Sequence, residues 1–298
     1  TKKIALWIFF IFCKIELQAS DDLLSLLDDT VLPKKIKKNA FKSTRVINSH
    51  SIEFLGKQVL DVRILHRFGA INGGLYEAFG IDQARVRLGL DYGINSRLMV
   101  GIGRSSYKKE ADAFVKYRIL WQSKGNKSIP FSLVWVSGIT DSFLKWENPD
   151  RKNYYTSRLG YYHQIIVGRK FSESFSLQLS PTLVHRNIVK TSNDKHDLFV
   201  IGAGTRIKLN RRVAITLDYI YQLPNQLADN IISALCIGFD IETGGHVFQL
   251  HFTNALGMNE RILALENEGK WSKGDVHFGF NISRVFTLGN PTKKEVSN

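Results

Sequence analysis

The sequence of 298 residues has very few cysteines and no long hydrophobic run. Its two cysteines, Cys13 and Cys236, are too few for a framework of disulfide bonds, and they do not have the spacing of a metal site. No apolar stretch reaches the ~18 residues that a transmembrane helix needs. The mean hydropathy is −0.13, and 44% of the residues are hydrophobic, which is enough for a folded protein. If the chain crosses a membrane, it must therefore do so with strands.

The chain also lacks a clustered basic surface, although its formal net charge is +14. Proteins that bind nucleic acids gather lysine and arginine into a patch or stripe that neutralises phosphates. Here the bases occur singly inside segments of alternating polarity, as Arg63, Arg85 and Lys116 do. We therefore expect no nucleic-acid partner.

The first residues have the composition of a cleavable signal peptide, which we predict over residues 1–20. Lys2 and Lys3 precede an apolar core at 4–13, and the small residues Ala19 and Ser20 follow. Cleavage would remove Cys13 and leave one thiol. Residues 21–58 are predicted to form a periplasmic leader and a possible plug, with acidic pairs between helix-spaced leucines, a basic stretch after Pro33, and a candidate extended segment at 44–55.

From Val59 onward the sequence alternates between apolar and polar residues, which is the period of a β-strand. Twelve such segments follow, each long enough to cross a bilayer at a tilt. A soluble β-sandwich also alternates, but here the second face carries Arg, Lys, Asp and Gly, and aromatic residues lie near strand ends. The pattern predicts an all-β fold, a transmembrane antiparallel up-and-down β-barrel of about 12 strands over 59–288, followed by a disordered tail at 289–298. Residues 131–138 and 159–167 are apolar on both faces, so their facing stays open.

The connections between these segments alternate in length, as they do in bacterial outer-membrane barrels. Short turns at 93–96, 171–174, 210–212 and 242–245 alternate with long ones at 69–82, 139–157, 187–197, 223–231 and 255–273. The brief connection at 107–112 and the longer one at 123–129 depart from the pattern. We expect the long connections to lie outside the cell. The last strand ends at Phe286 after alternating apolar residues, which resembles the terminal-strand signal that the barrel-assembly machinery recognises, although residues 287–298 continue past it.

Three segments carry a family resemblance: 41–48 (FKSTRVIN), 63–69 (RILHRFG) and 240–250 (DIETGGHVFQL). They resemble an uncharacterised family of single-chain outer-membrane β-barrel proteins, a domain of unknown function, over almost the whole mature chain. The resemblance implies the fold and the outer membrane of a Gram-negative-type bacterium. It implies no activity and no site residues.

Strand parity assigns ten bases, four acids and two histidines to the lumen. They are Arg63, Arg67, Arg85, Arg87, Arg97, Lys116, Arg118, Arg186, Arg206 and Lys208, then Asp61, Asp91, Asp218 and Asp240, and finally His251 and His277. The surplus of bases predicts a narrow, porin-like channel that prefers small anions. The acids of the leader, Asp21, Asp22, Asp28 and Asp29, would be attracted to such a bore.

Two other functions fit the same residues. A salt-bridged, occluded interior that only stabilises the barrel is equally compatible with the charges. A third possibility is an adaptor that binds a partner through external loops carrying Trp146, Tyr154, Tyr155 and Trp271.

The sequence shows no catalytic constellation. A membrane-embedded lipid hydrolase would need a nucleophile beside a base, and none of His66, His163 and His185 has a serine partner by spacing. Likewise His251 and His277 lack the further ligands of a metal site. We expect no enzyme, no cofactor and no metal; outer-membrane lipid, the assembly machinery and a small anionic solute are the expected partners.

Overall fold

The computed structural model describes residues 35–125, 127–189, 195–226, 230–243 and 246–288. The predicted signal peptide at 1–20, the acidic part of the leader and the tail at 289–298 lie outside these ranges. All of the described residues belong to one unit of the chain, Lys34–Asn298.

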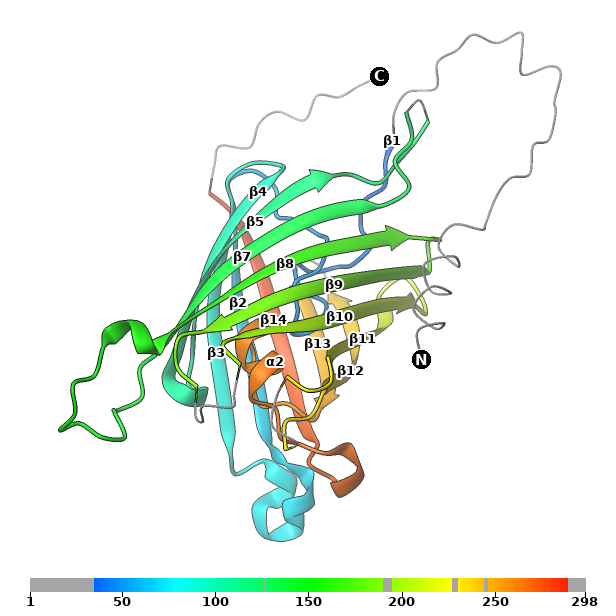
Figure 1. Cartoon of the computed structure of the whole chain (residues 1–298). Helices are drawn as coiled ribbons and strands as arrows, with labels where there is room; N and C mark the ends of the chain where they lie inside the picture. The colour runs from blue at the N-terminus through cyan, green and yellow to red at the C-terminus, as the bar shows by residue number, and fades with distance from the viewer. Residues whose placement is uncertain (1–34, 126, 190–194, 227–229, 244–245, 289–298) are drawn as a thin grey trace, which may run out of the picture. The chain divides into compact units, whose positions relative to one another are not determined.

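Twelve antiparallel strands form a closed barrel, in which each strand pairs with the next along the chain and the last pairs with the first (Figure 1). The predicted fold is thereby confirmed, and the first barrel strand begins at Val59. The strands are β2 (Val59–Ala70), β3 (Ala84–Gly93), β4 (Leu98–Ser105), β5 (Glu110–Leu120), β7 (Ser132–Ser142), β8 (Leu159–Lys170), β9 (Phe175–Arg186), β10 (Asp197–Lys208), β11 (Val213–Gln222), β12 (Ala234–Thr243), β13 (His246–Thr253) and β14 (His277–Thr287).

The two faces of the barrel wall differ as the alternation predicts. In β2, Asp61, Arg63 and Arg67 are buried on the inner face, whereas Ile64 on the outer face is exposed. Large apolar side chains such as Leu88 and Phe252 are exposed on other strands as well. An apolar outer surface is what a barrel presents to lipid. Among the described residues no helix is long and apolar enough to span a membrane.

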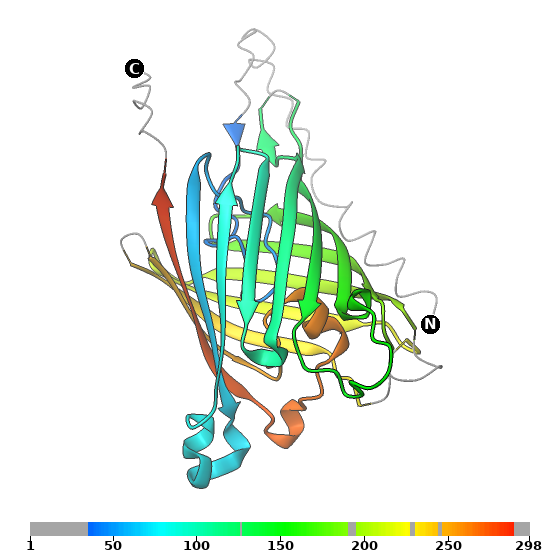
Figure 2. The same ribbon diagram turned by 90° about the vertical axis from the view of Figure 1, so that its left-hand side faces the viewer.

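Short turns and long loops occupy opposite ends of the barrel (Figure 2). The long-loop end carries the short helical elements: turns within Ile71–Gly80, Tyr155–Arg158 and Trp271–Lys273, and the helix α2 (Glu260–Leu265). The brief connection between β4 and β5 also lies at this end and contains the helical turn Tyr107–Lys109, so it is the exception that the sequence predicts. The connection after β5 belongs to the short-turn end. Its unusual length has a structural reason, because it contains β6 (Ser123–Lys124), which pairs with β1 (Lys35–Ile36).

The two strands of ambiguous facing have apolar residues on both sides. Val134 and Val136 of β7, and Tyr162 and Ile166 of β8, are buried on the inner face. Their neighbours in sequence, among them Trp135, point outward. An apolar inner face needs something apolar inside the barrel to cover it.

Candidate functional site

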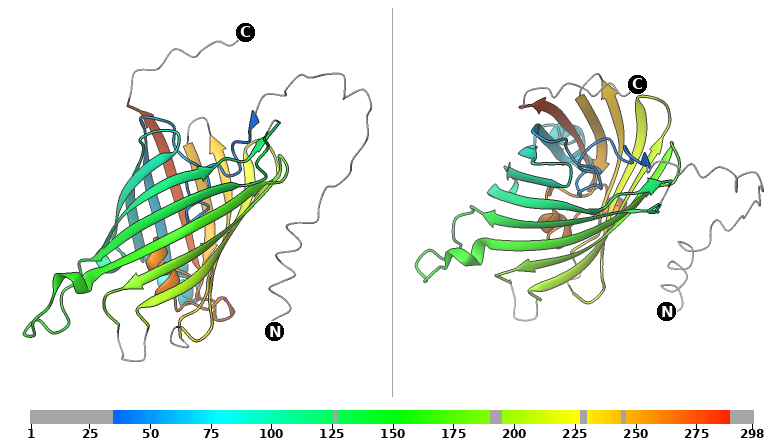
Figure 3. Two further views of the ribbon diagram at one scale, coloured as in Figure 1. Left: turned by 45° about the horizontal axis from the view of Figure 1, so that its top comes forward. Right: turned by 90° about the horizontal axis from the view of Figure 1, so that it is seen from above.

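Residues 40–55, called the inner segment from here on, lie within the ring of strands (Figure 3). The chain enters from the short-turn end, where β1 pairs with β6, and returns there to begin β2. Phe41, Val46, Ile47 and Ile52 are each at most 4% exposed. The segment consists of bends with one isolated bridge, so the extended segment proposed for 44–55 does not form.

Without regular secondary structure, the main-chain groups of the inner segment need partners from the wall. The carboxylate of Asp218 in β11 provides several of them. It accepts hydrogen bonds from the backbone N–H of Asn48 (2.8 Å) and of Ser49 (2.9 Å), and from the Ser49 hydroxyl (2.6 Å). Asp218 thus holds the turn at the deepest part of the segment.

Three amide side chains of the wall bind further main-chain groups. Gln178 accepts from the N–H of Ile52 (3.1 Å) and donates to the carbonyl of His50 (2.7 Å). Gln249 donates to the carbonyl of Val46 at 2.6 Å, and Asn281 donates to that of Ile47 at 2.9 Å. Polar residues that the sequence places on the inner face therefore bind peptide groups rather than line an open aqueous bore.

The wall cations also donate to neutral oxygens of the inner segment. Lys116 donates to the carbonyls of Thr44 (3.1 Å) and Glu53 (2.7 Å). Arg118 donates to the carbonyl of Ile52 at 3.2 Å. Similarly, Arg63 donates to the hydroxyls of Ser43 (2.6 Å) and Thr44 (3.1 Å), and Arg67 donates to the side-chain oxygen of Asn48.

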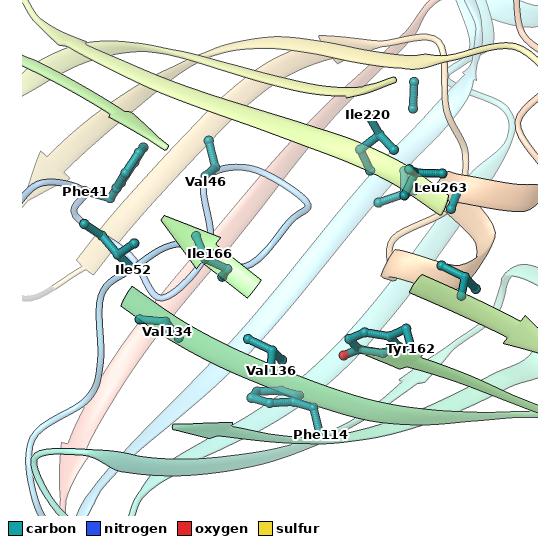
Figure 4. Packing of buried hydrophobic residues seen from close by; sticks show 14 of the residues in the cluster. Phe41, Val46, Ile52, Phe114, Val134, Val136, Tyr162, Ile166, Ile220 and Leu263 are labelled. Carbon is teal, nitrogen blue, oxygen red and sulfur yellow. The ribbon is translucent and has the colours of Figure 1, made fainter. Parts of the chain in front are cut away.

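Apolar contacts also hold the inner segment against the barrel wall. Phe41, Val46 and Ile52 belong to one buried cluster with wall residues such as Val134 and Ile166 (Figure 4). Two wall glycines allow close approach. A Cβ atom at Gly204 would lie 2.7 Å from Cγ2 of Val46, and one at Gly168 would lie 2.7 Å from Cγ2 of Ile52. The wall is therefore shaped to fit this segment.

A second element enters the lumen from the long-loop end. The helix α2 lies inside the barrel (Figure 2), and Ile262, Leu263 and Ala264 are at most 1% exposed. Asn259 caps it by accepting a hydrogen bond from the N–H of Ile262 at 3.0 Å. Arg261 anchors it to β5 through two hydrogen bonds of 2.8 Å to the carboxylate of Glu110.

The inner segment and α2 meet at a buried ion pair. Arg45 Nη1 lies 2.7 Å from Oε1 of Glu260, and His50 Nε2 lies 3.3 Å from the same oxygen. Burial raises the pKa of Glu260 above its usual value, although the charge of Arg45 opposes the shift. One pair thus joins the element that enters from the short-turn end to the one that enters from the long-loop end.

The sequence-predicted lumen residues divide into two groups. Twelve are buried: Arg63, Arg67, Arg87, Lys116, Arg118, Arg206, Asp61, Asp91, Asp218, Asp240, His251 and His277. The other four lie at strand ends, where Arg85 and Arg97 are exposed and Arg186 and Lys208 are half-buried. Parity cannot separate these groups, because it gives a side chain's face and not its depth.

The interior is also less basic than the predicted ten bases against four acids. Among the described strand residues, seven buried side chains are basic and six are acidic: Arg63, Arg67, Arg87, Lys116, Arg118, Lys170 and Arg206 against Asp61, Asp91, Glu110, Asp112, Asp218 and Asp240. Sequence reasoning missed Glu110 and Asp112 because the start of β5 was assigned to a connection. Asp112 binds Arg87 through contacts of 2.8 and 2.5 Å, and Asp61 and Asp240 neutralise Arg63 and Arg206.

Three buried wall cations have no carboxylate within ion-pair distance in the described part of the chain. They are Arg67, Lys116 and Arg118. Lys116 and Arg118 lie over the ring of Phe54, with the Arg118 guanidinium 4.1 Å from its centroid. Cation–π contacts and neutral oxygens take the place of counterions here.

The histidines give no metal centre. His251 and His277 are both buried on the inner face, and His277 Nδ1 lies 3.1 Å from the carbonyl of Phe68. Across the described ranges, no three His, Cys, Asp or Glu side chains are grouped to hold a metal ion.

The structure does bring one serine and one histidine together that the sequence spacing did not reveal. Ser137 of β7 and His163 of β8 are cross-strand partners on the outer face, with Oγ 2.9 Å from Nδ1. A hydrolytic triad also needs a group that orients the imidazole. No such partner of His163 is found among the described residues, so this is a polar pair whose hydrogen bond lowers the cost of facing lipid.

The fold and the filled lumen define a class of protein: a membrane-spanning β-barrel with an apolar exterior and a polar, occupied interior. The chain belongs to the family described as "Membrane bound beta barrel domain (DUF5777)", whose model matches residues 41–286. The matched region includes the inner segment as well as the barrel. The protein is thus an outer-membrane β-barrel of a Gram-negative-type bacterium, as the resemblance implied.

Solved structures with a similar fold include porins and channels. The NanC porin is 8% identical, with 77% of this chain and 100% of that chain covered and a TM-score of 0.48. The KdgM porin is 8% identical, with 78% and 99% covered and a TM-score of 0.44. An outer membrane channel from Pseudomonas putida F1 is 15% identical, with 78% and 97% covered and a TM-score of 0.45. At such low identity these likenesses concern the fold alone. No curated protein matches the sequence.

Proposed function

We propose that this barrel is a narrow, porin-like channel, closed in the described conformation by the inner segment, which conducts small anions when that segment withdraws. The observation that carries the proposal is that the unpaired wall cations bind neutral oxygens of a removable segment. A purely structural interior would be expected to pair those cations with wall carboxylates.

Withdrawal would uncover charge of both signs. Arg67, Lys116 and Arg118 would lose their contacts with the inner segment. Asp218 would lose the main chain of 48–49, and Asp91 would lose the hydroxyl of Thr44, which lies at 3.2 Å. Withdrawal would also take Arg45 away from Glu260 and the hydroxyls of Ser43 and Thr44 away from Arg63. Four buried cations (Arg63, Arg67, Lys116 and Arg118) against three buried carboxylates (Asp91, Asp218 and Glu260) leave a small positive excess, which in a confined bore lowers the barrier for anions.

The chain offers a reversible lock for testing the gate. Cys236 of β12 is buried and is the cross-strand partner of Asp218, whose carboxylate binds the N–H of Asn48. In Asn48→Cys, oxidation should therefore join the inner segment to the wall, and reduction should release it. Asn48→Ser is the matched control, because it also removes the amide that Arg67 contacts but cannot form a disulfide bond.

Purified protein in planar lipid bilayers is then compared before and after reduction. Reduction should raise the conductance of Asn48→Cys and leave that of Asn48→Ser unchanged. Under a salt gradient, the reversal potential should have the sign expected for an anion-selective channel. Equal conductance of the oxidised and reduced forms of Asn48→Cys would contradict the proposed gate. Cation selectivity would contradict the proposed anion preference. If no form conducts, the barrel is sealed, and its function lies in the external loop that exposes Tyr154 and Tyr155.

A further inference from the structure

A hollow runs along the outer face of β4, β5 and β7, strands that lie side by side in Figure 1. Two adjoining cavities of about 840 and 580 Å³ share Leu90, Ile102, Ala113 and Ile139, and together they form what we call the outer groove. Its walls are almost entirely apolar. Outward-facing cavities of this size are comparable to small-molecule binding sites.

The strand register explains why the wall is hollow there. Ala113 stands directly between Ile102 on β4 and Ile139 on β7, and Ala111 stands between Arg104 and Asp141. Small side chains on the central strand between longer ones on both neighbours produce a furrow along β5. A furrow that is open to the hydrocarbon and parallel to a strand suits a single extended acyl chain.

The long-loop end of the outer groove is cationic. Arg104 lines the groove, with its guanidinium 4.5 Å from the ring centroid of Phe143 and Nη1 2.7 Å from the carbonyl of Lys109. The N–H of Phe143 donates to that same carbonyl at 3.1 Å. Arg158 joins the same rim, because its Nη1 donates to the carbonyl of Ser142 at 2.9 Å.

The charges of this rim favour an anion. Arg104 and Arg158 form no ion pair within the described residues, and they are held by backbone carbonyls and aromatic rings. Two carboxylates line the groove at this end. Asp141 already accepts a hydrogen bond from Tyr155, and Asp112 is buried and bound to Arg87. Because Asp112 is already paired with Arg87, two unpaired cations, Arg104 and Arg158, lie near one remaining carboxylate, Asp141, at the mouth of an apolar furrow.

We infer that the outer groove binds a phosphorylated, acylated glycolipid of the lipopolysaccharide type. One acyl chain would lie along Ala111 and Ala113, and a headgroup phosphate would bind between Arg104 and Arg158. With the long loops outside the cell, this end of the barrel lies in the leaflet that holds such lipids. Arginine suits this position because its guanidinium binds phosphate oxygens through two parallel hydrogen bonds. Binding of this lipid is independent of whether the bore conducts.

The test uses the full chain in mild detergent and native mass spectrometry with three added lipids: a bisphosphorylated lipid A, its dephosphorylated form, and phosphatidylethanolamine. Wild type should retain lipid A at least tenfold more than either other lipid. Ala113→Leu, which fills the furrow, and Arg104→Gln, which removes a cation, should each reduce that retention at least fivefold.

Two substitutions elsewhere on the outer face serve as controls. Ala203→Leu fills an outward alanine position on β10, and Arg284→Gln removes an outward arginine that lies 5.0 Å from the ring of Phe286. Both should retain lipid A as wild type does, and heat-dependent gel mobility reports folding of every variant. Equal loss in the controls, or equal retention of all three lipids by wild type, would overturn the inference.

Discussion

Asp218 is the position at which the filled lumen can be tested most directly. Its carboxylate accepts from four donors of the inner segment: the N–H of Asn48, the N–H of Ser49, the hydroxyl of Ser49 and, at a longer 3.4 Å, the N–H of Ile47. Asp218→Ala leaves these donors without an acceptor in the closed state, whereas water can satisfy them once the segment has withdrawn. The substitution therefore acts on the closed state and should shift the equilibrium toward the open one.

The size of the shift depends on the number of donors. A buried donor left without a partner costs about 1–3 kcal/mol. Loss of the three shorter of these hydrogen bonds, with some relaxation, destabilises the closed state by about 3–5 kcal/mol on the same scale. Since each ~1.4 kcal/mol is a factor of ten, the open population should rise by about 10²- to 10⁴-fold. Asp218→Asn keeps one acceptor oxygen and should lie between wild type and Asp218→Ala.

Two measurements check this prediction. Single-channel recording gives the open probability, and hydrogen exchange followed by mass spectrometry gives the protection of residues 40–55. Asp112→Asn is the matched control, because Asp112 is also a buried wall carboxylate but binds Arg87 and not the inner segment. If Asp218→Ala neither conducts more nor exchanges faster than Asp112→Asn, the inner segment is not held as we describe.

Three further predictions concern selectivity, stability and assembly. Compared with Asp218→Ala alone, Lys116→Met combined with Asp218→Ala should move the reversal potential toward the value of a cation-selective channel, as measured under a salt gradient. Arg45→Met leaves Glu260 buried without its ion-pair partner and should cost about 3–5 kcal/mol of unfolding free energy. Burial already raises the pKa of Glu260 in the folded state. The folded Arg45→Met protein therefore binds the proton on Glu260 more tightly than the unfolded protein does. Thermal unfolding should show that the stability of this variant falls as the pH rises above the usual glutamate range. Phe286→Ala should lower the amount of protein inserted into outer membranes, whereas deletion of residues 289–298 should not. Immunoblots of membrane fractions measure this amount. A larger loss in the deletion than in Phe286→Ala would contradict the terminal-strand signal.

The barrel itself could be predicted from the sequence because its determinants are local. A period of two survives in nearly every strand, since one face meets lipid and the other meets polar groups. The long connection after β5 looked irregular because its partner, β1, lies more than 80 residues away in the sequence. Pairing over such a distance leaves no local pattern.

The contents of the lumen could not be predicted in the same way. Residues 44–55 adopt bends that are stabilised by side chains of distant strands, including Gln178 and Asn281. Nothing within the segment specifies that conformation. Yet the sequence carried one signal: Val134, Val136 and Ile166 make the inner faces of β7 and β8 apolar, which is unexpected for a strand facing a water-filled bore. The ambiguity of facing at 131–138 and 159–167 was itself a mark of an occupied interior.

The way in which the inner segment is held bears on whether it can leave. Within the described residues, its main chain at 40–55 bonds to wall side chains such as Asp218, Gln249 and Lys116, and not to the main chain of any barrel strand. Withdrawal would thus break no bond of the strand ladder, and the closed ring of twelve strands would keep all of its own pairings. At the entrance, the β1–β6 pair joins only two residues on each side, which is too short to be stable by itself. Water entering the bore could replace each side-chain partner in turn. A strand built into the sheet could not be removed in this way, and for this reason we favour a gate over a permanent core.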